Sequence, residues 1–198
     1  MKNVKRCFWV ESQKDKDFYV DYHDHEWGKP VHDDQLHFEF MVLEGAQAGL
    51  SWVTILSRRD AYRKAYMNFD VKKVAKFTEK KIESLLNNEG IIRNKLKINS
   101  SVNNAKLFIE IQKEFGSFDK YIWSFVGKKP IINKRRSRKD YVATSKESDA
   151  LSKDLKQRGF KFTGSTIMYS HMQACGLVMD HEVGCFCYKK LSKNKLRS

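Results

Sequence analysis

Proline and cysteine are both scarce in this chain of 198 residues. The two prolines, Pro30 and Pro130, leave long stretches in which nothing interrupts a helix. Four cysteines in a cytosolic chain argue against a disulfide framework and favour metal binding for some of them. No stretch approaches the length of an apolar membrane span, and no sustained apolar run follows the basic residues near the N-terminus as in a signal peptide. We therefore expect a soluble, cytoplasmic protein.

Acidic residues are also outnumbered, with 24 Asp and Glu against 38 Lys and Arg and a formal net charge of +14. A polyanion is the expected partner of such a chain, and nucleic acid is a commoner one than an anionic membrane surface. Basic proteins without this function exist, so charge alone indicates a class of partner and no activity.

The sequence contains no internal repeat, no low-complexity linker and no alternating run long enough to require a sheet. With 41% hydrophobic residues it can fill one core, so we expect a single all-α domain over residues 1–198. Residues that favour helix starts, together with apolar periodicity, predict helices that begin after Asp33 or Asp34, after Ser51, after Asp70 and after Thr78; the second continues through Tyr66. A longer helix is predicted from about Arg93 to Phe115. Two more are predicted, one from a Thr144–Glu147 capping box to Gly159 and one from about Ser165 to Cys175.

Two segments are expected to lack regular structure. The stretch from Gly127 to Tyr141 is crowded with Lys and Arg and has few apolar residues, which predicts a solvated loop. The residues from Lys189 to Ser198 are mostly basic and polar, and we expect them to be frayed.

Potential metal ligands lie at opposite ends of the chain: Cys7 and His23 near the start, His181 and Cys185 near the finish. Two cysteines and two histidines make the ligand set of a closed tetrahedral zinc site, which would join the N- and C-terminal segments. The spacing matches no single compact zinc motif, and buried thiols beside ordinary histidines explain it as well. Other candidates are His25, His32, His37, His171, Cys175 and Cys187.

Two short stretches combine a carboxylate with aromatic or small residues. In residues 43–52, Glu44 stands among glycines and alanines and is followed by Trp52; tight helix packing and a flat-ligand site both fit this pattern. In residues 19–28, tyrosines, acids, Trp27 and the potential ligand His23 lie within ten positions. Aromatic walls with a polar group at one edge are how base-flipping proteins hold a nucleotide, although such aromatics are more often core.

A third stretch, residues 85–95, has the pattern of a helix, a turn through Gly90 and a basic helix. A helix-hairpin-helix has this order and offers backbone N–H groups to a DNA phosphate. A simple helix C-cap at Gly90 is the alternative.

Together these residues match a known family. The chain resembles bacterial DNA-3-methyladenine glycosylase I, the constitutive alkylation-repair branch of the helix-hairpin-helix glycosylase superfamily. The resemblance runs from Cys7 to Cys185 and rests on residues 22–28, 43–52, 90–93, 123–126, 151–153, 158–162, 172–177 and 180–185.

The resemblance implies an all-α helix-hairpin-helix glycosylase fold with the hairpin at about residues 78–113. It implies one structural Zn²⁺ held by Cys7, His23, His181 and Cys185, within terminal segments 1–30 and 177–190. It implies a base pocket with Trp52 and Tyr22 as stacking walls, Tyr19 and Trp9 nearby, and Glu44 as the acid that hydrogen-bonds the base. DNA contacts are assigned to Gly90, Ile92, Arg93 and Lys95.

The implied activity is monofunctional excision of 3-methyladenine from double-stranded alkylated DNA, which leaves an abasic site. Lys95 lies near the position of a Schiff-base lysine in bifunctional relatives, but the local pattern follows the monofunctional type, so no lyase activity is expected. A monomer in the bacterial cytoplasm, associated with the nucleoid, is expected.

Two alternatives belong to other classes. The first is a DNA-binding module whose terminal segments are joined by zinc; it would need the basic face and the hairpin but neither Glu44 nor a pocket. A zinc hydrolase or nucleobase deaminase is disfavoured, because the His-x-Glu and Pro-Cys-x-x-Cys pattern is absent and four protein ligands leave zinc no open position. Cys187, two residues from Cys185, is a possible substitute ligand.

Overall fold

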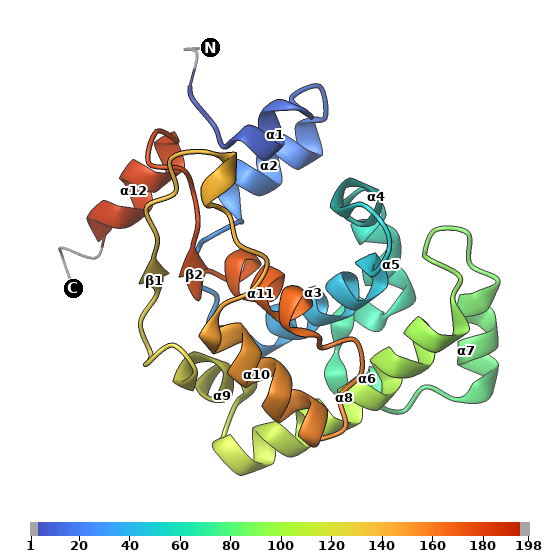
Figure 1. The fold of residues 1–198 in the computed structure, drawn as a ribbon. Coiled ribbons are helices and arrows are strands. Elements are labelled where there is room, and N and C mark those ends of the chain that lie inside the picture. Colours follow the sequence, from blue (N-terminus) through green and yellow to red (C-terminus); the bar gives the residue numbers. More distant parts are fainter. Residues whose placement is uncertain (1–3, 195–198) are drawn as a thin grey trace.

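The computed structural model describes residues 4–194, and most of them are helical (Figure 1). The elements in chain order are α1 (Phe8–Glu11), α2 (Asp17–His25), α3 (Asp34–Gln47), α4 (Trp52–Leu56), α5 (Arg59–Ala65), η1 (Met67–Phe69), α6 (Val71–Val74), α7 (Glu79–Leu86), α8 (Lys95–Phe115), α9 (Phe118–Ser124), β1 (Ile131–Ile132), η2 (Arg138–Asp140), α10 (Lys146–Gln157), α11 (Ser165–Ala174), β2 (Val178–Met179) and α12 (Phe186–Asn194). The all-α prediction is therefore confirmed. Among residues 4–194, no helix is long and apolar enough to cross a bilayer.

Helix α3 is the centre of the molecule. Every residue from His37 to Ala46 is buried, and the helix packs against α4, α8, α9 and α11. It begins where the sequence predicts, because the Asp33 side chain accepts a hydrogen bond from the Leu36 N–H at 2.7 Å. A helix buried all round serves as a scaffold, and this one carries Glu44 into the interior.

Other predicted helix starts are also observed. The side chains of Ser51, Asp70 and Thr78 each accept a backbone hydrogen bond at the start of α4, α6 and α7. The single helix expected from Ser51 through Tyr66 is wrong, because α4 ends at Leu56 and α5 begins at Arg59. At the break, the Ser57 hydroxyl donates to the Thr54 carbonyl at 3.1 Å, a local bond that competes with continuation of the helix.

The capping box of α10 lies one position later than predicted. Ser145 and Ser148 exchange the two hydrogen bonds: the Ser148 N–H donates to the Ser145 hydroxyl at 3.2 Å, and the Ser145 N–H donates to the Ser148 hydroxyl at 2.8 Å. Ser148 is fully buried and can fill the role that the pattern gave to Glu147.

Helices α7 and α8 form a hairpin around the turn at residues 87–94. Within the turn, the Gly90 N–H donates to the Asn88 side chain at 2.9 Å, and the Asn94 side chain caps α8 by accepting from the Lys97 N–H at 3.0 Å. The Ile92 N–H donates to the Tyr62 hydroxyl at 3.1 Å. The turn is thus fixed by side chains from within it and from α5.

The basic segment 127–141 is more ordered than the predicted solvated loop. Its strand β1 pairs in parallel with β2, with Ile131 opposite Val178 and Ile132 opposite Met179. Arg135 forms an ion pair with the buried Asp180 at 3.0 Å. Pairing with a distant segment is invisible to local sequence patterns; the other basic side chains, including Lys134 and Lys139, remain exposed as expected.

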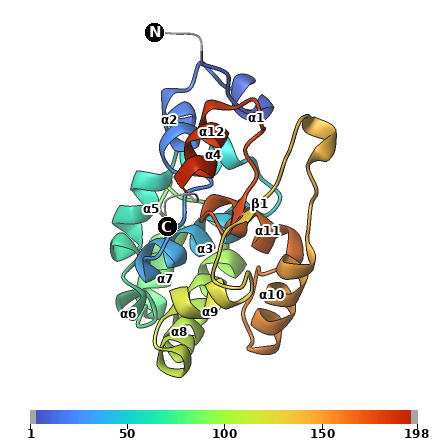
Figure 2. The same ribbon diagram turned by 90° about the vertical axis from the view of Figure 1, so that its left-hand side faces the viewer.

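The two terminal segments lie side by side, with α12 next to α1 and α2 in both views (Figures 1 and 2). The Phe186 N–H donates to the Lys5 carbonyl at 3.0 Å, and the Phe8 N–H donates to Glu182 at 3.0 Å. The expected fraying from Lys189 is wrong as far as Asn194, because α12 is helical through that residue; residues 195–198 lie outside the described part of the chain.

Candidate active site and metal centre

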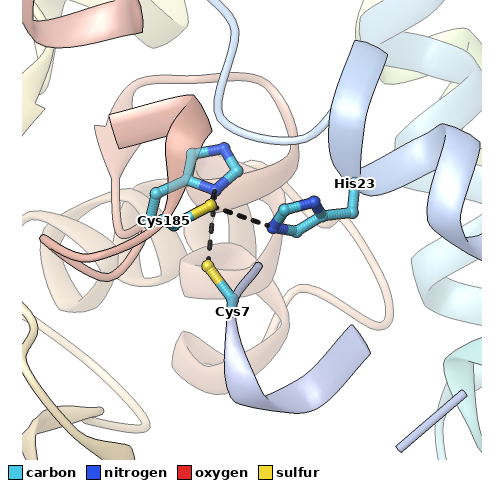
Figure 3. A group of neighbouring side chains, drawn as sticks. Cys7, His23 and Cys185 are labelled. Carbon is cyan, nitrogen blue, oxygen red and sulfur yellow. Dashed lines mark hydrogen bonds between the residues drawn. The ribbon is translucent and has the colours of Figure 1, made fainter. Parts of the chain in front are cut away.

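Four side chains from the two ends of the chain converge in the interior. Cys7 precedes α1, His23 lies on α2, and His181 and Cys185 lie between β2 and α12; all four are fully buried. Figure 3 shows Cys7 and His23 directed toward Cys185. The sulfur–nitrogen distances are 3.4 Å from Cys7 to His181 Nδ1, 3.6 Å from Cys185 to His23 Nε2 and 3.7 Å from Cys185 to His181 Nδ1.

This geometry fits a tetrahedral metal ion. With Zn–S near 2.3 Å and Zn–N near 2.05 Å, a tetrahedron has sulfur–nitrogen edges of about 3.6 Å. The second nitrogens of both rings are hydrogen-bonded: His23 Nδ1 to Asp24 at 2.7 Å and His181 Nε2 to the Trp27 carbonyl at 2.9 Å. These partners leave the other nitrogen of each ring free to bind a metal. The four residues therefore form a buried group, the metal group, that could hold a metal ion.

Cys187 lies outside this tetrahedron. Its sulfur is directed at the carbonyl oxygens of His23 and Asp24, at 3.8 Å and 3.9 Å. The thiol can donate to these oxygens and remain a small buried side chain.

A cavity of about 280 Å³ lies beside the metal group. It is many times the roughly 30 Å³ that a water molecule occupies and suits a small flat ligand. Its lining comes from α1, α2 and the turn that follows it, α3, α4, α11 and the basic segment, and consists of Phe8, Trp9, Tyr19, Tyr22, Trp27, Glu44, Gln47, Trp52, Tyr141, Ser170, Gln173 and Ala174.

Aromatic rings make most of the cavity wall. Tyr22 and Trp52 have ring centroids 5.7 Å apart, and Trp9 packs edge-on against Tyr19 at 5.3 Å and Trp27 at 5.0 Å. The indole N–H groups of Trp9 and Trp52 are buried without a hydrogen-bond partner in the described residues. Buried donors without partners cost free energy, so these two indoles are held in place by the packing around them and not by hydrogen bonds.

Charge in the cavity is limited to one acidic group. Glu44 lines it, whereas no Lys or Arg from residues 4–194 does. Burial raises the pKa of Glu44 well above its usual value, and one oxygen, Oε2, lies 2.8 Å from His171 Nδ1. The other oxygen has no hydrogen-bond partner within the described chain. Such a site suits a neutral or cationic flat ligand and disfavours an anion.

The residues predicted for the base pocket all reach this cavity. Glu44, Trp52, Tyr22, Tyr19 and Trp9 come from four different helices and line one space. The sequence prediction did not include Gln47, Ser170, Gln173 or Tyr141. Gln47 lies three positions after Glu44 on α3, so helical periodicity could have identified it, whereas the others come from distant segments with no local signal.

The residues predicted to contact DNA are not part of the cavity. Gly90, Ile92, Arg93 and Lys95 lie in the hairpin turn and at the start of α8, where the Arg93 and Lys95 side chains are exposed. The Gly90 and Ile92 N–H groups already donate within the protein, so the exposed basic side chains are the part of this set that remains open to a phosphate.

Comparison with known proteins agrees with this arrangement. The family model described as methyladenine glycosylase matches residues 9–188. DNA-3-methyladenine glycosylase 1 of Escherichia coli K12 is 45% identical over 185 residues, covering 93% of this chain and 97% of that protein. A crystal structure of a 3-methyladenine DNA glycosylase I superposes with a TM-score of 0.88 at 46% identity, covering 92% of this chain and 99% of that one. The structure of a variant of such a glycosylase in complex with 3-methyladenine superposes with a TM-score of 0.84 at 37% identity, covering 86% and 92%.

Proposed function

The chain belongs to the methyladenine glycosylase family and excises 3-methyladenine, and from this premise we propose how its pocket performs the reaction on double-stranded alkylated DNA. The observation that carries the proposal is the aromatic cavity with a single buried carboxyl group. An extruded base fits in this cavity against the aromatic rings, and the water that adds at the sugar leaves an abasic site.

The leaving base needs little help from an acid. Methylation at N3 makes the adenine cationic, so the bond from C1′ to N9 is weakened and the base departs neutral. The protein has to extrude the nucleotide, bind the damaged base and favour an oxocarbenium-like sugar until water adds. A cationic base over the rings of Tyr22 and Trp52 gains about 1 to 2 kcal/mol of cation–π attraction once water is excluded.

Glu44 binds the polar edge of the base in this mechanism. Its free oxygen accepts a hydrogen bond from the exocyclic amine, and its negative charge suits a cationic ring. Gln47 and Gln173 line the same cavity and can satisfy further polar atoms of the base. No lysine among residues 4–194 lines the cavity, which supports direct hydrolysis without a Schiff base.

The α7–α8 hairpin holds the DNA. Exposed Arg93 and Lys95 contact backbone phosphates, and the net charge of +14 supplies a longer-range attraction. Such contacts position the duplex and carry no selectivity for the damaged base.

Cys7, His23, His181 and Cys185 would hold one Zn²⁺ as a structural ion. Four protein ligands fill a tetrahedral site and leave no open position for water or substrate. When bound, the ion supplies a cross-link between terminal segments. Since Cys7 is followed by Phe8 and Trp9, and His23 follows Tyr22, this cross-link also fixes walls of the cavity.

The test is release of free bases from alkylated duplex DNA, followed by chromatography, with the unaltered protein and Glu44→Gln. We expect selective release of 3-methyladenine by the unaltered protein. Loss of a charged hydrogen bond worth about 1.5–3 kcal/mol should lower kcat/KM of the variant roughly 10- to 150-fold.

Glu110→Gln is the matched control, because Glu110 is exposed and pairs with Lys113 on the surface of α8. It should leave base release unchanged. If the folded, zinc-loaded protein releases no base at all, the enzyme is excluded and a DNA-binding module remains.

A further inference from the structure

Three buried side chains lie behind Glu44, and the base-binding scheme does not use them. His171 on α11, His37 on α3 and Cys175 at the end of α11 all have zero exposure. They do not line the cavity. His171 is nevertheless in direct contact with Glu44, which makes it the route by which the others act on the base site.

The two imidazoles and the carboxyl group form a chain of hydrogen bonds. His171 Nδ1 lies 2.8 Å from Glu44 Oε2, and its Nε2 lies 3.3 Å from His37 Nδ1. His37 Nε2 lies 3.2 Å from the Val31 carbonyl oxygen. The chain therefore ends on a backbone atom that can only accept.

That terminal acceptor fixes the position of each proton along the chain. His37 must donate from Nε2 to the Val31 carbonyl, and because burial lowers its pKa to about 3, it is neutral and carries no second N–H. Its Nδ1 is therefore an acceptor, and His171 must donate from Nε2. A neutral His171 then has a lone pair on Nδ1, so the 2.8 Å contact requires the proton to be on Glu44.

The only other donor in reach within the described chain is the Cys175 thiol, 3.7 Å from His171 Nε2. If the thiol donated there, the lone pairs of His171 Nε2 and His37 Nδ1 would face each other at 3.3 Å. A thiol is a weak donor and does not offset that repulsion. Donation from His171 to His37 is the more stable arrangement.

We propose that His171 is a positioning residue that accepts the Glu44 proton when a cationic base enters the cavity, so that a carboxylate forms opposite a methylated adenine and not opposite an ordinary one. The Glu44 O–H bond breaks and the His171 Nδ1–H bond forms, and no proton enters or leaves the protein. The proposal rests on the role of Glu44 given above.

A cationic base drives this transfer because it lies next to Glu44, which lines the cavity, and further from His171, which does not. Its charge stabilises the carboxylate more than it opposes the imidazolium. In the empty cavity, burial raises the pKa of Glu44 and lowers that of His171 to about 3, and both shifts keep the proton on Glu44. A neutral adenine provides no charge to reverse this preference.

Other titratable groups around the pair do not replace the base in this role. Tyr22 faces Glu44 from α2, and burial raises the pKa of both Tyr22 and Cys175, so both stay neutral. Arg59, on α5, is neutralised by ion pairs with Glu39 and Glu26.

At the His37 end of the hydrogen-bonded chain, Asp119 and Asp34 face His37 and not Glu44. The charge that moves the proton has to come from the ligand.

The first experiment determines the histidine tautomers by ¹⁵N NMR of the unaltered, histidine-labelled protein without ligand. We expect His37 and His171 both to be neutral and protonated at Nε2. A neutral His171 protonated at Nδ1 would overturn the proposal, because Glu44 would then already be a simple carboxylate. This measurement requires no catalysis, so its outcome is separate from that of the glycosylase assay.

The second experiment is the pH profile of 3-methyladenine release by His171→Gln. Gln can donate a hydrogen bond to Glu44 but cannot accept its proton. The variant therefore needs bulk solvent to deprotonate Glu44, whose raised pKa keeps the proton bound up to higher pH. We expect kcat/KM about tenfold or more below the unaltered protein at pH 7 and rising with pH, while the unaltered protein stays flat from about pH 6 to 9.

His25→Gln is the control, because His25 is exposed on α2 and pairs with Asp21; its profile should match that of the unaltered protein. If kcat/KM of His171→Gln is lower by the same factor at every pH, the role of His171 is structural and the proposal is overturned. If circular dichroism shows that His171→Gln does not fold, the tautomer measurement decides alone.

Discussion

Residues that line the cavity and residues that could hold the metal ion are neighbours in the sequence at two places near the N-terminus. Cys7 is followed by the cavity residues Phe8 and Trp9, and Tyr22 is followed by His23. Adjacent residues on a helix point in different directions, so one segment can bind the metal on one side and line the cavity on the other. At the scale of single residues, the group that could hold a metal ion and the cavity wall are therefore built from the same short segments.

A second residue-scale constraint is the glycine at position 176. Its φ is +69°, and a Cβ there would come within 2.2 Å of the Lys29 carbonyl carbon. This close approach holds the end of α11 against the segment after α2. We expect Gly176→Ala to lower the free energy of unfolding by about 2–5 kcal/mol, through backbone strain and overpacking together.

Gly49→Ala separates these two causes, since Gly49 has a similar φ of +78° but a Cβ there would meet nothing within 4 Å. It should cost only about 1 kcal/mol. Chemical denaturation of both variants gives the comparison; equal losses would mean that the contact with Lys29 does not matter.

At the scale of elements, one lysine connects the α7–α8 hairpin to the end of α3. Lys97, on the first turn of α8, donates from Nζ to the carbonyls of Ala46 at 2.8 Å and Ala48 at 2.7 Å. These carbonyls lie at the C-terminal end of α3, where a cation is favourable. The helix that we expect to approach DNA is therefore fixed to the end of the helix that carries Glu44.

The hairpin assignment predicts a change in salt dependence. Lys95→Ala should weaken binding to undamaged and damaged duplex equally and reduce the slope of log K against log salt concentration by about 0.9. Lys113→Ala, at the other end of α8 and paired with Glu110, should leave the slope unchanged. Fluorescence anisotropy over a salt series measures both, and equal slopes for all three proteins would remove the hairpin from the DNA interface.

The sequence predicted helix starts better than the break within residues 51–66 and the strand in the basic segment. The Asp33, Ser51, Asp70 and Thr78 caps depend on residues three positions apart, and the sequence shows them directly. The break between α4 and α5 depends on a competing serine hydrogen bond, and β1 depends on a partner strand that pairs Ile131 with Val178. Neither cause is local enough to appear as a periodic pattern.

At the scale of the whole molecule, the metal group was predictable because its donor chemistry is rare. Few residue types bind zinc, so two such side chains near each end of the sequence, four in all, were recognisable as a potential site. Tyr141, Ser170 and Gln173 carry no such signature, and only the fold brings them to the cavity. The His37–His171 chain was also missed as a unit, because its geometry depends on how α3 packs against α11.

Loss of the metal group should destabilise the molecule and weaken base binding together. Cys185→Ser should lose the ion and lower the free energy of unfolding by about 2–5 kcal/mol, the range for removing a cross-link that closes a long loop. The melting temperature would fall by roughly 4–20 °C. Affinity for 3-methyladenine should also fall, because Trp9 and Tyr22 lose their anchor.

Cys187→Ser is the matched control, since Cys187 is buried nearby but lies outside the tetrahedron. It should retain one zinc per chain by elemental analysis. Equal zinc loss in both variants would assign Cys187 to the site.

The separation of the metal ligands along the chain also sets the order in which the enzyme is made. A ribosome synthesises Cys7 174 residues before His181. Until His181 and Cys185 have emerged, the four-residue group next to Phe8 and Trp9 is incomplete, and the α11 side of the cavity does not exist before residues 165–174 are made. A nascent chain of this length contains the basic hairpin but not a complete cavity, so we expect it to be unable to remove a base before residues 165–185 have been made.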